Sequence, residues 1–248
     1  MNFSIIELDE TESTNSDALE HARLGAAEGV CVIARRQTSG RGRLGRKWVS
    51  EKDSGLYFSI ILRPTVDTKY LPLLTLLTGI AVHESLRHYR IDADIKWVND
   101  ILVNDKKIAG ILAETADTPR GLAVVVGIGI NLASRNMSSD LAGIATSMES
   151  ETGSFPTPGE MSGILTGFLS TYYRMLLDGE TDKILEGWRQ RSSYYSGKPV
   201  RVTSEGRSFE GITAGLEANG ALKVRLPDGS MKVVQAGDVQ RLRAASTL

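Results

Sequence analysis

One stretch limits the possible folds more than any other: AVVVGIGINL, residues 123–132, is apolar almost without interruption. Its valines and isoleucines favour an extended strand. A strand that is apolar on both faces must be buried on both faces, which places it near the centre of a sheet. The 248-residue chain is long enough to bury such a sheet under helices. We therefore predict an α/β (α+β) fold with a sheet that is flanked by helices.

The remainder of the first 196 residues supplies the other parts of this layer. Thr14 or Asn15 is expected to cap a helix over SDALEHARL. Asn104-Asp105 is a turn signal, and it predicts a hairpin between ILV and KIAGILAE. Further strands are expected at residues 3–8, 29–37, 55–63 and 95–99, and further helices at about 70–89, 161–176 and 183–192, with a strand or short helix around Leu141, Ile144, Thr146 and Met148.

The character of the chain changes after Ser196. Short alternating runs are separated by turn signals at Glu205-Gly206, Asn219-Gly220 and Asp228-Gly229. This pattern is typical of a small, highly curved β-barrel. We predict two domains, at residues 1–196 and 197–248.

Composition excludes several functional classes. The chain has 29 Lys and Arg and 30 Asp and Glu, and a net charge of −1 argues against a general polyanion binder. Cys31 is the single cysteine, in an apolar run that predicts a buried thiol, and the three histidines are expected on helix surfaces. The N-terminus lacks a signal peptide, and residues 71–82 are too polar to span a bilayer. We expect a cytoplasmic protein with no membrane partner.

Against this balanced background, SGRGRLGRKW at residues 39–48 concentrates four basic residues and three glycines. Gly40 to Gly45 satisfy GxGxxG, but a dinucleotide fingerprint needs a following helix, and RKWVSEKDSG has no apolar helical face. Walker A and kinase loops are excluded because GK is not followed by Ser or Thr, and because HRD and DFG motifs are missing. Two interpretations stay open: a solvated basic loop, or a strand-to-strand loop that wraps a small anion.

Three other stretches each allow a structural and a functional interpretation. Ser13-Thr14-Asn15 is either a helix cap or a polar cluster that suits a ureido or amide ligand. Lys96 to Glu114 is either a hairpin with a solvated turn or a source of phosphate and magnesium contacts. The glycines of GIGINL, Gly127 to Leu132, mark either tight sheet packing or the close approach of a ligand.

Taken together, these stretches resemble the biotin protein ligases, also called biotin–[acetyl-CoA-carboxylase] ligases. The resemblance covers nearly the whole chain and is most specific at GRGRxGRxW. Its implied fold is a class II synthetase-like catalytic domain with a mixed or antiparallel sheet, plus a C-terminal SH3-like barrel. The matched segments are STN at 13–15, QTSGRGRLGRKW at 37–48, GLYFSIILRP at 55–64, KWVND at 96–100, KKIAGILAE at 106–114 and GIGIN at 127–131.

The resemblance implies an ATP-dependent ligase with a two-step reaction. The carboxylate of biotin attacks the α-phosphate of ATP, in the presence of Mg²⁺, and gives biotinyl-5′-AMP and pyrophosphate. A lysine of a biotin carboxyl carrier protein, from acetyl-CoA carboxylase or a related carboxylase, then takes the biotinyl group and releases AMP. The family also implies a homodimer. Some members carry an N-terminal DNA-binding module, for which this sequence has no space, so we expect an enzyme with no nucleic-acid partner.

The same resemblance implies a role for individual residues. Arg43 and Lys107 are the implied catalytic residues, of which Arg43 retains the adenylate and Lys107 polarises the α-phosphate. Asp100 is implied to position magnesium or the incoming lysine. The implied biotin site comprises Ser13, Thr14, Asn15, Gln37, Gly40, Arg41, Gly42, Arg43, Lys107, Gly110, Ile111 and Gly127, and the implied adenylate site comprises Arg41, Arg43, Arg46, Trp48, Lys107 and Asn131.

The sequence departs from the family pattern at two places. Val98 stands in KWVND where many members have proline, which removes no functional group. GIGIN is followed by Leu132-Ala133 in place of a further asparagine, so no adenine contact is assigned there. Lys106 adjoins the implied active-site lysine, and the spacing to IAG favours Lys107. A lipoate-type acyl ligase and a non-catalytic biotin-binding regulator are the alternative functions.

Overall fold

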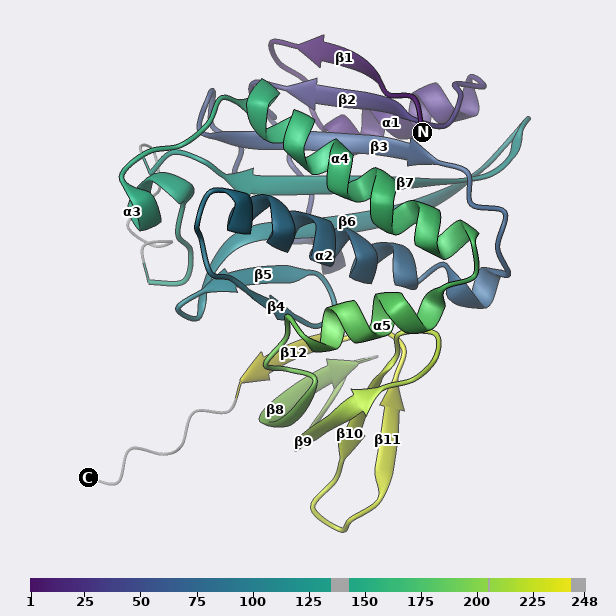
Figure 1. The fold of residues 1–248 in the computed structure, drawn as a ribbon, viewed down its shortest axis with the longest axis vertical. Coiled ribbons are helices and arrows are strands. Elements are labelled where there is room, and N and C mark those ends of the chain that lie inside the picture. The colour runs from purple at the N-terminus through teal and green to yellow at the C-terminus, as the bar shows by residue number, and fades with distance from the viewer. Residues whose placement is uncertain (135–142, 205, 242–248) are drawn as a thin grey trace.

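The apolar run forms the central strand of the larger of two sheets. A computed structural model describes residues 1–134, 143–204 and 206–241 (Figure 1). Strand β7, Gly121–Asn131, is fourth in a seven-stranded sheet of order β1-β2-β3-β7-β6-β5-β4. Its position confirms the prediction that continuous apolarity made.

The other strands of this sheet follow the predicted order along the chain. Only β1 and β2 pair in parallel, and every other neighbouring pair is antiparallel, so the sheet is mixed as expected. Asn104 and Asp105 form the predicted hairpin turn with φ of 52° and 63°. The strands are β1 Ser4–Leu8, β2 Val30–Ala34, β3 Gly55–Leu62, β4 Asp94–Lys96, β5 Asp100–Val103 and β6 Lys106–Thr118.

Helices cover both faces of the sheet and create two separate cores. Helices α2 (Leu73–His88), α4 (Pro158–Leu177) and α5 (Thr181–Arg189) lie on one face, in front of the strands in Figure 1. The opposite face is covered by α1 (Thr14–Arg23), whose alanines and Leu19 pack on Val125 and its neighbours. Along β7, Val124, Val126, Ile128 and Ile130 join the large core, whereas Ala123 and Val125 face α1. Both cores require the strand to be apolar on each side.

Two local expectations change. Helix α1 begins at Thr14 with Ser13 as its N-cap, and the expected caps Thr14 and Asn15 are buried helical residues instead. His83 is buried in α2 at 7% exposure, because this helix is covered by the sheet on one side and by α4 and α5 on the other. A third expectation, a strand or short helix around Met148, is met by the short helix α3 (Met148–Thr152), and Leu141 lies outside the described residues.

The segment after Ser196 forms a five-stranded antiparallel sheet of order β11-β10-β9-β8-β12. We expected a small, highly curved β-barrel here; the described residues form the antiparallel sheet, without a ladder between the outer strands β11 and β12 that would close it. The short connection between these two strands faces the loop at residues 40–48, where the Gly237 carbonyl accepts a hydrogen bond from Arg43 at 3.3 Å. The strands are β8 Ser196–Ser204, β9 Arg207–Leu216, β10 Leu222–Arg225, β11 Met231–Val234 and β12 Asp238–Arg241, and Glu205 lies outside the described residues.

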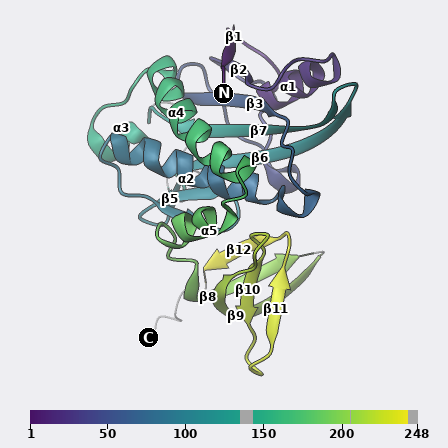
Figure 2. The ribbon, with the colours of Figure 1, turned by 45° about the vertical axis from the view of Figure 1, so that its right-hand side comes forward.

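The smaller sheet packs against the end of the larger one, below α5 in Figure 2. The buried Trp97 indole donates a hydrogen bond to the carbonyl of Gly220 at 3.0 Å. Gly220 has φ of 85°, and an added Cβ would lie 2.7 Å from the side chain of Leu76. Valines of β8, β10 and β12 therefore extend the same core that α2 covers.

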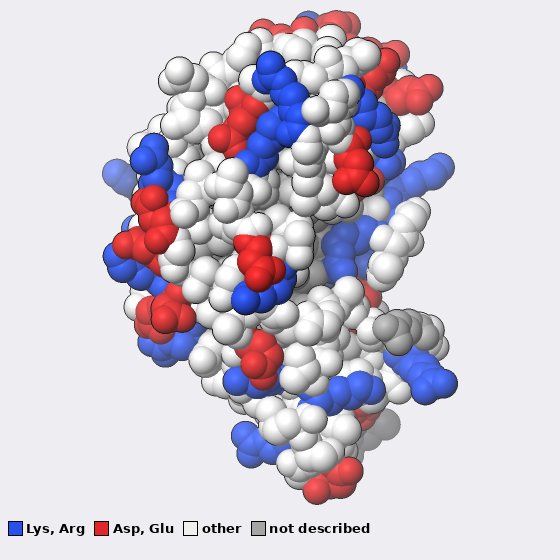
Figure 3. Space-filling model, turned by 90° about the vertical axis from the view of Figure 1, so that its right-hand side faces the viewer, with Lys and Arg blue, Asp and Glu red and all other residues white. Residues whose placement is uncertain are grey.

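The distribution of charge, the helices and the single cysteine can each be compared with what the composition indicated. Basic and acidic side chains are interspersed on the face drawn in Figure 3, with no broad field of one sign. None of the helices in the described ranges combines the length and apolarity that crossing a bilayer would require. Cys31 is completely buried in β2, as predicted, and desolvation raises the pKa of its thiol to about 12.

Candidate functional site

A pocket opens on the α1 side of the sheet, where β6 and β7 carry three glycines, Gly110, Gly127 and Gly129. Two rows cross β3, β7 and β6 in register: Tyr57–Gly129–Gly110 and Ser59–Gly127–Leu112. Because side chains alternate along a strand, these residues share the face on which Val125 packs against α1. The three glycines remove the side chains that would otherwise fill this region. The pocket therefore follows from glycine at alternate positions of a buried strand.

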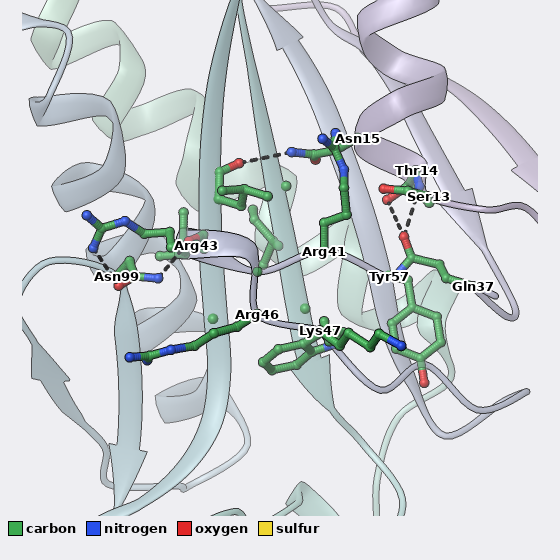
Figure 4. A pocket seen from close by; sticks show the side chains of 18 of the residues that line it. Ser13, Thr14, Asn15, Gln37, Arg41, Arg43, Arg46, Lys47, Tyr57 and Asn99 are labelled. Atoms are coloured by element: carbon green, nitrogen blue, oxygen red, sulfur yellow. Dashed lines mark hydrogen bonds between the residues drawn. The ribbon is translucent and has the colours of Figure 1, made fainter. Parts of the chain in front are cut away.

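The first wall of the pocket is the segment Ser13–Asn15, the STN turn, with Gln37. The Gln37 side-chain oxygen accepts hydrogen bonds from the Thr14 amide at 2.9 Å and the Thr14 hydroxyl at 3.1 Å. The Asn15 side-chain amide donates to the Leu112 carbonyl at 3.2 Å and to Glu114 at 2.8 Å. All three STN residues are buried, so this polar wall is held rigidly (Figure 4).

Glycine 127 leaves the space that the STN turn occupies. A Cβ at this position would lie 2.1 Å from Oδ1 of Asn15. Opposite it, the fully buried Ser59 hydroxyl lies 2.6 Å from the same oxygen and 2.8 Å from the Thr14 hydroxyl. Gly127 and Ser59 together therefore set the position of the Asn15 amide.

The second wall is the arginine loop, defined as Gly40–Trp48, which joins β2 to β3 as predicted. Two backbone hydrogen bonds close it into a narrow turn, from the Gly42 amide to Arg46 and from the Trp48 amide to Gly40. A single 3₁₀ turn, Arg43–Gly45, forms its tip, where Leu44 has φ of 57°. An exposed leucine in this left-handed conformation is unusual and shows that the tip is tightly bent.

The arginines of this loop contact both sheets. Arg41 forms a two-pronged ion pair with Glu114 of β6, at 3.0 and 2.8 Å. Arg43 donates to the Asn99 side chain at 3.2 Å and to the Gly237 carbonyl at 3.3 Å. Arg46 pairs with Asp238 at 2.7 Å. The connection between β11 and β12 therefore forms part of the site, which sequence patterning did not indicate.

The two arginines that face the smaller sheet differ in their electrostatic environments. Burial lowers the pKa of Arg43, and the charges of Asp100 and Asp238 oppose that effect. For Arg46, the hydrogen bond that it donates to the Asp238 carboxylate dominates and raises its pKa. Within the part of the chain that the structure describes, Arg43 is thus a desolvated cation with no carboxylate in direct contact, which makes it a suitable partner for an anionic ligand.

The loop ends in Trp48, whose indole lies over the glycines of the floor. An added Cβ at Gly129 would lie 2.4 Å from this ring, and one at Gly110 would lie 3.1 Å from it. The Lys107 ammonium is 5.2 Å from the centre of the indole. The indole nitrogen is buried and has no hydrogen-bond partner within the described residues.

A short chain of charges borders the pocket at its β5–β6 end. The Lys107 ammonium lies 2.6 Å from Asp100, and Lys96 approaches the same carboxylate at 3.5 Å. Asp100 is therefore balanced by two lysines, and no cluster of three His, Cys, Asp or Glu side chains occurs among the residues described. These groups do not fit a metal site built by the protein alone, because a carboxylate held by two ammonium groups is a poor ligand.

Most of the residues proposed from the sequence line this one pocket. Gly40 instead packs against the backbone of Trp48, and Asn131 donates to the carbonyl of Thr146 at 2.9 Å, so neither residue lines it. Ile111 lines the pocket although its side chain belongs to the large core. The residues brought together are Ser13, Thr14, Asn15, Gln37, Arg41, Gly42, Arg43, Arg46, Trp48, Asp100, Lys107, Gly110, Ile111 and Gly127.

Sequence reasoning missed several residues of the site. Tyr57 and Asn99 line the pocket, as does Gly129, which belongs to GIGINL but was not assigned to the biotin site, and Ser59 lies beneath it. Two signals were present: Gly129 follows Gly127 at the strand period, and Ser59 interrupts the apolar strand GLYFSIIL. Asp238 and Gly237 gave no signal, because their contacts with the loop span nearly two hundred residues of sequence.

Two family models match the chain. The Biotin/lipoate A/B protein ligase family matches residues 8–131, and the Biotin protein ligase C terminal domain matches residues 195–242. The first match includes the STN turn, the arginine loop and Lys107. The second match coincides with the five-stranded sheet.

Individual relatives and solved structures agree with these matches. The bifunctional ligase/repressor BirA of Bacillus spizizenii is 36% identical over 242 residues, which cover 95% of this chain and 74% of the relative. The biotin–[acetyl-CoA-carboxylase] ligase of Paracoccus denitrificans is 33% identical over 92% of this chain and 97% of the relative. Biotin protein ligase from Aquifex aeolicus in complex with biotin and ATP aligns with a TM-score of 0.85 at 29% identity, over 97% of this chain and 99% of that one.

Proposed function

The chain belongs to the biotin protein ligase family, and on this basis we propose that it joins biotin to a carrier protein at the expense of ATP. The convergence of three segments carries the proposal. The STN turn, the arginine loop and Lys107 come from distant parts of the sequence and border one pocket (Figure 4). The STN turn and Gln37 give the pocket polar uncharged groups, and Arg43, Arg46 and Lys107 give it positive charge.

In the first step, the STN turn and Gln37 hold the ureido ring of biotin. Hydroxyl and amide groups fit this ring because it offers both donors and acceptors. A carboxylate oxygen of biotin attacks the α-phosphorus of ATP. The bond between this phosphorus and the oxygen of the leaving pyrophosphate breaks, and biotinyl-5′-AMP forms. Arg43, Arg46 and Lys107 stabilise the negative charge on the phosphate as it develops. For Lys107 and Arg46, this contact replaces the carboxylates Asp100 and Asp238 that they contact in the structure.

In the second step, the amine of the carrier lysine attacks the carbonyl carbon of the mixed anhydride. The bond between this carbon and the phosphate oxygen breaks, AMP leaves, and the nitrogen releases one proton to solvent. Asp100 lies 2.6 Å from Lys107, and it is the nearest carboxylate that could position the incoming ammonium group. The arginine loop, with Arg43 and Trp48, excludes water from the anhydride until the carrier arrives.

Magnesium fits this site only as an ion that arrives with ATP. Asp100 is already neutralised by Lys96 and Lys107, and no other carboxylate accompanies it in the pocket lining. Bound Mg²⁺ would reduce the charge of the triphosphate. The residues of this chain bind and orient that phosphate, and no step depends on a metal held by the protein.

The assembly and context of the enzyme are also part of the proposal. We propose a catalytic unit at residues 1–196 and a C-terminal unit at residues 197–248, a homodimer, and a cytoplasmic location with no nucleic-acid or membrane partner. The domain division rests on the two separate sheets. Sedimentation velocity with and without biotin and ATP tests the dimer, and a mobility-shift assay with DNA tests the last expectation.

Two measurements test the reaction. Biotin-dependent exchange of labelled pyrophosphate into ATP reports the first step, and streptavidin detection of a purified carrier domain reports the second. Lipoate replaces biotin in the matched control, because the family description includes lipoate ligases. We expect both activities with biotin and neither activity with lipoate. Transfer of lipoate without transfer of biotin would refute the proposal, and biotin binding without pyrophosphate release would indicate a non-catalytic regulator.

A further inference from the structure

The carboxylate of Glu114 joins two parts of the site that otherwise make separate contacts. Its Oε1 accepts a hydrogen bond from Arg41 at 3.0 Å, and its Oε2 accepts one from Arg41 and one from Asn15, both at 2.8 Å. Glu114 does not line the pocket itself. A single side chain therefore links the STN turn to the arginine loop.

On this flank, apolar packing between the arginine loop and β6 contributes little to the link. A hollow of about 580 Å³ lies between the arginine loop and the Leu112–Glu114 segment of β6. The Arg41 side chain reaches across to Glu114, whose side chain is 26% exposed. The ion pair, rather than apolar contact, therefore holds this flank of the loop against the sheet.

At the other end of the link, Asn15 has a defined orientation. Its carbonyl oxygen lies 2.6 Å from the Ser59 hydroxyl, and its amide nitrogen faces two acceptors, the Leu112 carbonyl and Glu114. The residue is 4% exposed, so an unpaired amide group would be costly. A ligand that fixes Asn15 consequently also fixes the carboxylate that holds Arg41.

We propose that Glu114 is a positioning residue that couples occupancy of the biotin pocket to the position of the arginine loop. It acts through Asn15 and Arg41 and touches neither substrate nor the reacting atoms. The inference rests on the proposed function, since it takes biotin as the ligand of the STN turn. Its consequence is that biotin bound at one wall stabilises the loop that covers the phosphate at the other wall.

The test uses the full chain with Glu114→Gln, which keeps the shape of the side chain and removes its charge. We expect calorimetric biotin affinity to fall about fivefold, which is at the upper end for a partly exposed ion pair with one further hydrogen bond. Turnover at saturating biotin should stay within about twofold. Biotin should protect the arginine loop of the wild type from trypsin, and this protection should be about fivefold weaker in the variant.

The chain contains a matched control. Glu10 accepts a hydrogen bond from Arg36 at 2.8 Å, and this exposed pair lies outside the pocket lining. Glu10→Gln removes the same chemistry and should leave biotin affinity and loop protection unchanged. An equal loss in both variants would overturn the proposal, because the effect would then be one of general charge or stability.

Arg41→Gln tests the same link from the exposed loop, where a folding defect is not expected. In that background, Glu114→Gln should have less than half of its separate effect on loop protection, and full additivity would refute the coupling. If Glu114→Gln keeps both the biotin affinity and the loop protection of the wild type, the role of Glu114 is refuted and the proposed function is not. A wild type without biotin-dependent pyrophosphate exchange would instead refute the proposed function, so the two failures are distinguishable.

Discussion

Replacing Gly127 with alanine adds one methyl group at the most restricted point of the site. The strand backbone of β7 accepts alanine without strain, because Gly127 does not have a positive φ. The obstacle is Asn15, whose side-chain oxygen, carbon and nitrogen would lie 2.1, 2.7 and 3.0 Å from the new Cβ. We therefore expect the substitution to displace the Asn15 side chain.

The magnitude follows from the contacts that Asn15 would lose. Its hydrogen bond with Ser59 is neutral and contributes about 1 kcal/mol, and its bond to the Glu114 carboxylate contributes about 1.5–3 kcal/mol. Partial compensation by water gives an expected loss of about 2–3 kcal/mol in the free energy of unfolding. For a chain of this size, the melting temperature should fall by about 4–12 °C. Biotin affinity should fall about 30- to 150-fold, since the proposed function makes the same amide a contact of the ligand.

Differential scanning calorimetry and calorimetric biotin titration measure the two effects. Gly163→Ala is the matched control, because this glycine lies on the exposed side of α4 with no neighbouring atom within 4 Å of an added Cβ. Alanine there should stabilise the helix by about 0.5–1 kcal/mol. In an Asn15→Ala background, Gly127→Ala should cost less than about 0.5 kcal/mol. Additive losses in the double variant would refute the steric argument.

Four further predictions follow from the site and the core. Lys107→Ala should slow pyrophosphate exchange about 100-fold while biotin affinity changes by less than about threefold, and exchange at the wild-type rate would refute its role. Arg43→Gly should release activated biotin, and streptavidin blots should then show labelled bystander proteins; strict specificity would contradict the retention role. Burial opposes ionisation of Asp238, but the contact with Arg46 outweighs burial and lowers the pKa of this carboxylate below its ordinary value of 3.8. Ionised Asp238 therefore stabilises the fold at pH values above 3.8, and this stabilisation disappears as the pH falls through the lower pKa of the folded state. The urea midpoint of Arg46→Gln should decrease less between pH 5 and pH 3 than the urea midpoint of the wild type. The thiol of Cys31, with its pKa raised to about 12 by burial, should not react with a thiol reagent at pH 8 until denaturant is added, and rapid labelling of the native protein would refute this.

The sequence predicted those features that depend on local chemistry. The apolarity of residues 123–132 was sufficient to place β7 at the centre of the sheet, because burial on both faces leaves no other position. The loop after β2 was separated from dinucleotide fingerprints because no apolar helical face follows it. The helix cap was misplaced by one residue, since Thr14 and Asn15 use their side chains to contact Gln37, Ser59 and β6.

The other features depend on strand pairing and on contacts between distant segments. Register brings Gly129 beside Tyr57 and Gly110, and the period of the glycines alone does not reveal those partners. The open arrangement of the C-terminal sheet was also not predicted, because alternating residues and turns are equally compatible with a closed barrel. Asp238 became a site residue only through its contact with Arg46 across the two sheets.

The contacts of Arg43 and Arg46 with Gly237 and Asp238 have a consequence for protein engineering. Because the arginine loop is held by both sheets, the boundary near residue 196 is not a point at which the two units can be exchanged independently. A chimaera that replaces the C-terminal sheet should keep full activity only when the segment that includes Gly237-Asp238 matches the loop of its new partner. The smallest transferable part of this enzyme is therefore a pair of segments about 190 residues apart in the sequence.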